Sequence, residues 1–181
     1  MNLRKVILSS LFLALALVLP FLTGQIPTIG RLLLPMHIPV LICGLVCGWQ
    51  YGLTVGLIAP ILRGIMFGMP PLMPVGITMA FELAVYGMVA GLAFKMLKEK
   101  YGFTPLSIYL SLLVSMLAGR VMWGSVRYIL SQFFGVPFSW ELFLTGAFVS
   151  AIPGIILQVI LIPVLVISLK REILKLEEIY I

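Results

Sequence analysis

Long apolar runs recur along the whole of this 181-residue chain, separated only by short segments that contain glycine and proline. Such runs approach the ~20 residues that a helix needs to cross the hydrocarbon core of a bilayer. Hydrophobic residues make up 62% of the chain and charged residues 10%, whereas soluble domains carry roughly 25% charged residues. A water-soluble fold is therefore excluded, and we predict a membrane protein that is covered largely by lipid.

Six apolar segments are predicted to be transmembrane helices of one compact all-α bundle, a single integral membrane domain over residues 1–181. Residues 49–52 (WQYG) are interpreted as a tight turn. One helix through the second and third segments would be about 45 Å long, too long for a bilayer core of ~30 Å. The sixth segment is expected to be one helix with proline kinks. The predicted spans are residues 5–22, 35–48, 53–67, 75–96, 105–128 and 142–169.

Small residues are concentrated around the second and third segments. Four glycines are spaced four residues apart from Gly44 to Gly56, and such spacing lets helix backbones approach closely in a membrane. Cys43 and Cys47 lie in the same region, but two thiols without a nearby histidine or acid make an incomplete metal site. We therefore expect these residues to serve helix packing, and we predict no metal site.

Basic residues gather on one side of the predicted topology. Six spans place both termini on the same side, and eight of the 12 Lys and Arg residues fall there. Because basic loops stay in the cytoplasm, both termini are predicted to be cytoplasmic, and the loops at residues 24–34, 68–74 and 133–140 to face outward. These residues end apolar runs instead of forming aromatic-rich basic stretches, so nucleic acid is not an expected partner. The eight are Arg4, Lys5, Lys95, Lys98, Lys100, Lys170, Arg171 and Lys175.

Two ionisable residues lie well inside predicted spans, where charge is costly and usually faces the bundle interior or a wet cavity. Helix rise places Glu82 and Arg120 at similar depths, roughly 8–12 Å from the outer face. One interpretation is a structural ion pair. The other is that Arg120 and the nearby Arg127 receive an anionic ligand, because the guanidinium fork fits carboxylate or phosphate. One cavity can hold both.

Further polar and aromatic residues are candidates for the same site. His37 and Arg63 fall in the outer half, although a lone histidine there often bonds to the backbone. Gln158 is mid-span and either bonds across helices or lines the floor of a pocket. Aromatic rings on the same faces are expected to stack on the ligand. The candidate substrate-binding residues are Glu82, Tyr86, Arg120, Trp123, Arg127, His37, Arg63 and Gln158.

Catalytic motifs are missing from the sequence. It contains no GxxxxGK[ST] phosphate loop, no HExxH, no GxSxG and no Asp for a metal-binding carboxylate pair. We therefore predict no catalytic residues and no cofactor. A membrane enzyme acting on lipid or isoprenoid would need paired acids or a nucleophile. A self-sufficient carrier driven by an ion gradient, with Glu82 as its proton site, remains an alternative to a binding subunit.

Five short motifs together suggest a family. They are residues 34–41 (LPMHIPVL), 44–48 (GLVCG), 56–60 (GLIAP), 68–71 (GMPP) and 79–87 (MAFELAVYG). Over nearly its whole length the chain resembles the substrate-binding S components of energy-coupling factor (ECF) vitamin transporters. This resemblance implies a multi-pass protein of the bacterial plasma membrane that binds a vitamin near the outer face, under the loop between the first two helices.

The resemblance also implies partners. S components dock on a transmembrane coupling subunit driven by two ATPase subunits, and toppling of the S component releases the substrate inside. Docking uses small residues on the first helix, commonly Ala-x-x-x-Ala, for which Ser10 and Ala14 are the nearest match. No motif names the vitamin. Three arginines in the outer half against Glu82 favour an anionic one, niacin or pantothenate.

Overall fold

A computed structural model describes residues 3–23, 32–170 and 173–174. Within these residues the chain is helical, without a β-strand, and six of the helices have more than ten residues. The predicted all-α fold with six apolar helices is thus confirmed. The six are α1 (Leu3–Val18), α3 (His37–Cys47), α4 (Trp49–Phe67), α5 (Ile77–Tyr101), α6 (Pro105–Phe134) and α8 (Ile152–Ser168), with shorter pieces η1 (Leu19–Thr23), η2 (Leu72–Gly76), α7 (Trp140–Leu144) and η3 (Thr145–Val149).

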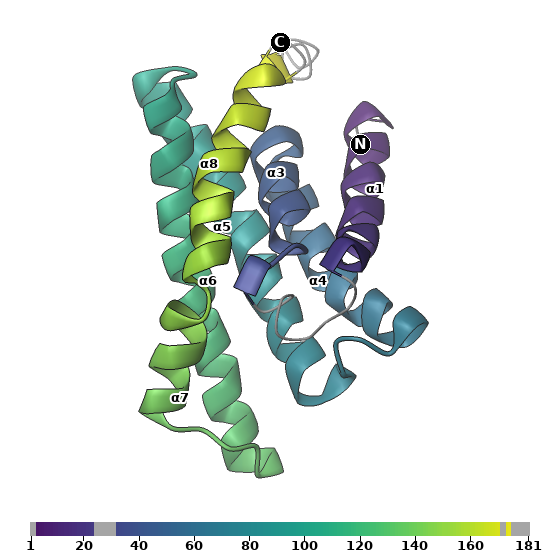
Figure 1. Ribbon diagram of the computed structural model, residues 1–181. Coiled ribbons are helices and arrows are strands. Elements are labelled where there is room, and N and C mark those ends of the chain that lie inside the picture. The colour runs from purple at the N-terminus through teal and green to yellow at the C-terminus, as the bar shows by residue number, and fades with distance from the viewer. Residues whose placement is uncertain (1–2, 24–31, 171–172, 175–181) are drawn as a thin grey trace.

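The beginning of α1 and the end of α8 lie at the same end of the bundle, at the top of Figure 1. Basic residues gather at this end. The ammonium groups of Lys98 and Lys170 both lie near the Phe103 ring, at 5.9 and 5.3 Å from its centre. The turns after α4 and α6 lie at the opposite end (Figure 1). This arrangement agrees with the predicted topology, while the cytoplasmic location of the basic end stays a prediction.

The helices differ in how they relate to lipid. The continuous stretch Leu3–Leu22, α4, Leu72–Tyr101 and α6 are long and apolar enough to cross a membrane, whereas α3 and α8 are shorter. All 11 residues of α3 are buried, because α1, α4, α5 and α8 surround it. With a length of about 16 Å, α3 is therefore a central core helix of the kind expected for short apolar segments.

Helices α3, α4 and α5 approach until their backbones touch. A Cβ atom added at Gly87 of α5 would lie 2.2 Å from the carbonyl oxygen of Gly52 on α4. A Cβ atom at Gly44 of α3 would lie 2.3 Å from the carbonyl oxygen of Gly87. Since real Cβ atoms do not approach carbonyl oxygens this closely, the three-helix contact exists only with glycine at these positions. The expected packing role of Gly44 and Gly52 is confirmed.

The turn between the second and third helices was predicted at the wrong place. Residues 49–52 belong to α4, and the chain reverses at Gly48, whose φ is +102°. Glycine adopts positive φ without the clash that a Cβ atom causes, so one residue is enough for the reversal. Gly91 of α5 makes room for the backbone of Trp49, which a Cβ atom there would meet at 2.5 Å.

The boundaries of the last helices also differ from the prediction. Helix α6 continues to Phe134, beyond the expected residue 128, and ends at Gly135, where φ is +63°. The expected single helix over residues 142–169 is wrong, because α7, the π-helical piece η3 and α8 replace it. Pro153 lies in the first turn of α8, where proline is well tolerated, so it begins this helix instead of kinking it.

We predict that Gly87→Ala destabilises the bundle by about 2 to 3 kcal/mol, because overpacking a close contact forces backbone shifts. For a chain of this size that amounts to a loss of about 5 °C or more in Tm, measurable by scanning fluorimetry of the purified protein in lipid nanodiscs. Leu92→Ala changes an exposed residue of the same helix and serves as the control with a small effect. Equal Tm values for Gly87→Ala and the wild type would contradict the prediction.

Candidate functional site

A buried ion pair joins α5 to α6. The Nη1 atom of Arg120 donates a hydrogen bond of 2.8 Å to Oε1 of Glu82. His37, the first residue of α3, places its Nε2 atom 3.7 Å from the same oxygen. All three side chains are buried, so residues from three helices meet around one carboxylate in the interior of the bundle.

Tyr86 holds this arrangement from one side. It follows Glu82 by one helical turn, and its ring lies edge-on to the His37 ring with 5.3 Å between centroids. Its other neighbour is Gly119 of α6, where a Cβ atom would meet the Tyr86 ring at 2.8 Å. The small residue just before Arg120 therefore lets α6 approach α5 closely enough for the ion pair to form.

Several buried nitrogen atoms of the cluster lack hydrogen-bond partners in the described part of the chain. These are Nε and Nη2 of Arg120 and both ring nitrogens of His37. A guanidinium group carries five N–H donors, and leaving a buried donor unpaired costs about 1–3 kcal/mol. Arg120 thus neutralises Glu82 through one nitrogen and keeps another edge of its guanidinium group available to a ligand.

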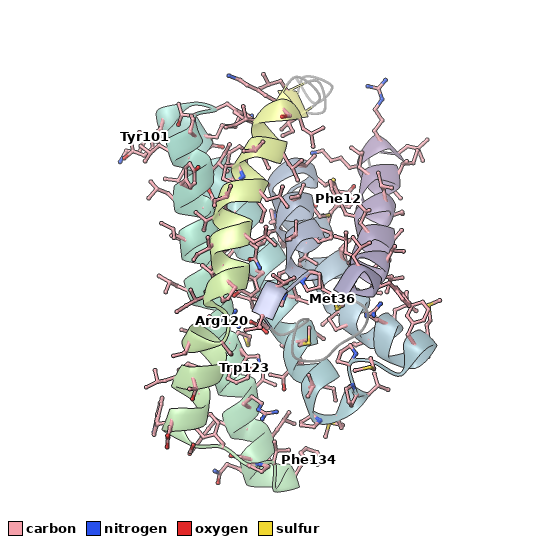
Figure 2. All side chains as sticks on the ribbon, viewed as in Figure 1. Phe12, Met36, Tyr101, Arg120, Trp123 and Phe134 are labelled. Atoms are coloured by element: carbon pink, nitrogen blue, oxygen red, sulfur yellow. The ribbon has the colours of Figure 1, made fainter. Side chains whose placement is uncertain are left out.

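A cavity of about 800 Å³ opens beside this cluster. Its size is within the range of small-molecule sites, and its wall is mostly apolar with a few polar groups, as is usual for such sites. Figure 2 shows Arg120 and Trp123 between the middle of the bundle and the end marked by Phe134, away from Tyr101. Among the described residues, the candidates that line the cavity are His37, Arg63, Glu82, Arg120, Trp123 and Arg127.

Aromatic rings form one wall of the cavity. Trp123 of α6 stacks on Phe143 of α7, with 5.9 Å between centroids and 26° between ring planes. Gly124 makes this possible, since a Cβ atom there would meet the Phe143 ring at 2.5 Å. The guanidinium carbon of Arg127 lies 5.6 Å from the centre of the Trp123 ring, a distance at which a cation is attracted to an aromatic face.

Phe138 and Phe143 also line this cavity, although neither is among the candidate residues predicted from the sequence. Both follow Gly135 in a segment that was predicted to hold an outward loop and the start of the last helix. Two aromatic residues close to a loop on the outer side were a usable signal. They could have been included because aromatic side chains supply much of the contact area of ligand sites.

Arg63 also lines the cavity and is tied to α1. Its Nη1 atom donates a hydrogen bond to the carbonyl oxygen of Leu17 in the last turn of α1. Its guanidinium carbon lies 4.8 Å from the centre of the Phe21 ring and 5.4 Å from that of Phe67. Carbonyls at a helix C-terminus carry partial negative charge, so Arg63 fastens the end of α1 to α4 and has this structural role beside any contact with ligand.

Two of the candidate residues are buried away from the cavity wall in the described part of the chain. Tyr86 packs behind the ion pair, as described above. Gln158 of α8 is buried, and its Nε2 atom has no hydrogen-bond partner, but it is absent from the cavity lining. Two roles were predicted for Gln158, a bond across helices or the floor of a pocket, and this nitrogen takes neither among the described residues.

The candidate docking residues lie on α1. Ser10 and Ala14 are exposed on its surface, and the Ser10 hydroxyl donates to the carbonyl oxygen of Val6. Of the predicted outer loop at residues 24–34, positions 24–31 lie outside the described residues. Its final residue, Leu34, lines the cavity together with Met36, so the end of this segment borders the site.

The family model for the substrate-specific component of ECF transporters matches residues 4–166. The chain belongs to this family. Searches among curated proteins and among solved structures gave no match. This S component is thus a transporter subunit, not an enzyme. Its apolar helices are those of a multi-pass membrane protein, and the resemblance inferred from the five motifs is confirmed.

We predict that Glu82→Gln destabilises the S component by about 3 to 5 kcal/mol, because it leaves the Arg120 charge buried without a counter-charge. The measurement is unfolding of the purified protein in mixed micelles titrated with denaturing detergent. Glu141→Gln removes an exposed carboxylate at the start of α7 and is the matched control.

A second variant separates charge from packing. Adding Arg120→Met to Glu82→Gln removes the stranded cation, so the double variant is expected to be more stable than Glu82→Gln alone. If Glu82→Gln were as stable as the wild type, or the double variant no more stable than Glu82→Gln, the pair would not contribute as described.

Proposed function

We propose that this S component binds a water-soluble vitamin or vitamin precursor with an anionic group and hands it to a coupling subunit powered by two ATPases. The observation that carries the proposal is the unused edge of Arg120. Its Nε and Nη2 atoms have no partner in the described part of the chain, although the residue is buried and lines a cavity of about 800 Å³. A carboxylate or phosphate would satisfy both donors in the paired geometry that guanidinium favours.

The charges around the cavity support an anion. Among the described lining residues, Arg63, Arg120 and Arg127 carry positive charge and Glu82 alone carries negative charge. Low-dielectric surroundings strengthen the attraction of such a cavity for an anion. Niacin and pantothenate each carry one carboxylate and fit this sign, whereas a cationic precursor would have to approach three arginines.

The energy for uptake is proposed to come from partner subunits. The sequence has no phosphate loop for ATP, and membership of the family supports pairing with coupling and ATPase subunits. We propose that Ser10 and Ala14 belong to the docking face, because they are small and exposed on α1. This helix packs mainly against α3 and α4 in the described part of the chain. Small residues let helices of two subunits approach closely.

A gradient-coupled carrier remains the second candidate, since Glu82 is an acid beside the cavity. Its carboxylate already accepts a hydrogen bond from Arg120, which engages the negative charge in the pair. The two candidates differ in what the chain does alone. Uptake of a radiolabelled vitamin into vesicles that contain only this protein would support the carrier, whereas dependence on the coupling and ATPase subunits would support the S component.

We predict that Arg120→Gln weakens binding of the anionic vitamin by about 10- to 100-fold, because hydrogen bonds to a charged group contribute about 1.5–3 kcal/mol. The measurement is isothermal titration of the purified protein with nicotinate and with pantothenate, alongside mass spectrometry of any molecule retained after gentle purification. Lys95→Gln, at the basic end of α5, is the control with no expected effect.

Neutral counterparts of the ligands give the decisive comparison. Nicotinamide and pantothenol lack the carboxylate, so they should bind the wild type weakly and be insensitive to Arg120→Gln. An Arg120→Gln variant that bound the retained molecule or either vitamin as tightly as the wild type would overturn the proposal.

A further inference from the structure

Three residues of α6 form one stripe along the cavity. Arg120, Trp123 and Arg127 are separated by three and four residues, a spacing that places side chains on the same face of a helix. All three line the cavity. Seven residues correspond to about 10.5 Å along the helix axis. The two guanidinium groups are therefore attached about 10 Å apart, with an indole ring between them.

The two arginines have different surroundings. Arg120 is buried, and Glu82 neutralises its charge, while its Nε and Nη2 atoms have no partner among the residues that the structure describes. Arg127 is half-buried and lies against the Trp123 ring. Among the described residues it forms no ion pair, since the ion pairs there join Glu82 to Arg120 and His37. The stripe thus offers a buried donor group at Arg120 and a less buried one at Arg127, whose charge has no counter-charge within the described residues.

The wall between the two arginines is flat and apolar. Trp123 is held by its stack on Phe143. The backbone also passes close to the indole at Gly146, where an added Cβ atom would lie 3.4 Å from the ring. A ring held by these contacts presents a constant surface to a ligand. Such a surface favours the apolar or planar middle of a molecule, while polar ends are favoured at the arginines.

We infer that the substrate is an elongated anion with two acceptor groups about 10 Å apart. Its acidic group binds Arg120, its middle lies over Trp123, and a second acidic, carbonyl or hydroxyl group accepts from Arg127. The inference rests on the proposed function, because it assumes the anion at Arg120. It also separates the two vitamins named above. Nicotinate is a single ring with one carboxylate and cannot reach both arginines, whereas pantothenate is a chain with a carboxylate at one end and hydroxyls at the other.

Straight-chain dicarboxylates of different lengths can test the inferred distance between the two acceptor groups of the ligand. The experiment measures the Tm of the purified full chain in lipid nanodiscs with dicarboxylates of increasing length, from succinate to dodecanedioate, and with monocarboxylates of matching length. The stabilisation is expected to be largest for chains whose carboxylates can lie about 10 Å apart, and at least twice that of the matching monocarboxylate. No length dependence, equal shifts for the two series, or no shift with any compound would overturn the inference.

Variants assign the effect to the stripe. Arg127→Gln should remove the advantage of the long dicarboxylates and weaken pantothenate at least tenfold, while nicotinate changes by less than twofold. Arg127→Lys keeps the charge and should retain part of the advantage. Ser125→Ala, at an exposed position of α6, is the control. If Arg127→Gln weakened short and long anions equally, the second arginine would only add general attraction, and the inference would be wrong.

The two proposals fail in different ways. Anion binding that survives Arg120→Gln would overturn the proposed function and, with it, this inference. Anion binding that is lost in Arg120→Gln, but whose length selectivity is absent from the wild type or persists in Arg127→Gln, would overturn the inference alone.

Discussion

The backbone contact among α3, α4 and α5 is the constraint on which the rest of the structure depends. Gly44, Gly52 and Gly87 meet there without side chains between them. In lipid the hydrophobic effect does not hold helices together, so close packing has to do so. Because α3 is drawn into the centre and wholly buried, its first residue, His37, reaches the carboxylate of Glu82. The polar cluster thus follows from a contact made only of backbone.

The polar cluster contributes little to the stability of the folded protein in lipid and adds an unfavourable desolvation free energy. A buried pair such as Glu82–Arg120 adds little net stability, because desolvation of both charges offsets their attraction. The nitrogens of Arg120 and His37 that find no partner among the described residues are a further cost. A core of apolar side chains would be easier to fold. Unsatisfied donors beside a cavity are better explained by a ligand that completes their hydrogen bonds, as expected where stability is given up for function.

Depth along a helix predicted much of the site. Glu82 and Arg120 were placed at similar depths by helix rise alone, and they form a hydrogen bond. The same reasoning did not foresee that Tyr86 is outside the cavity lining among the described residues, because periodicity gives the face of a helix but not where a cavity ends. The bond from Arg63 to the Leu17 carbonyl was beyond prediction. Its acceptor is a backbone atom 46 residues away, and any residue type can supply such an acceptor.

The sequence by itself determined the class of protein, the set of apolar helices and the charges that lipid does not tolerate, because composition and spacing state these directly. It also carried the family motifs. Only the tertiary structure decided that the chain reverses at Gly48, that α3 is the central helix, and which rings of α7 cover the site. These depend on which backbones can touch and which donors find partners. Both are set by distances between residues far apart in the chain, which spacing along the sequence does not contain.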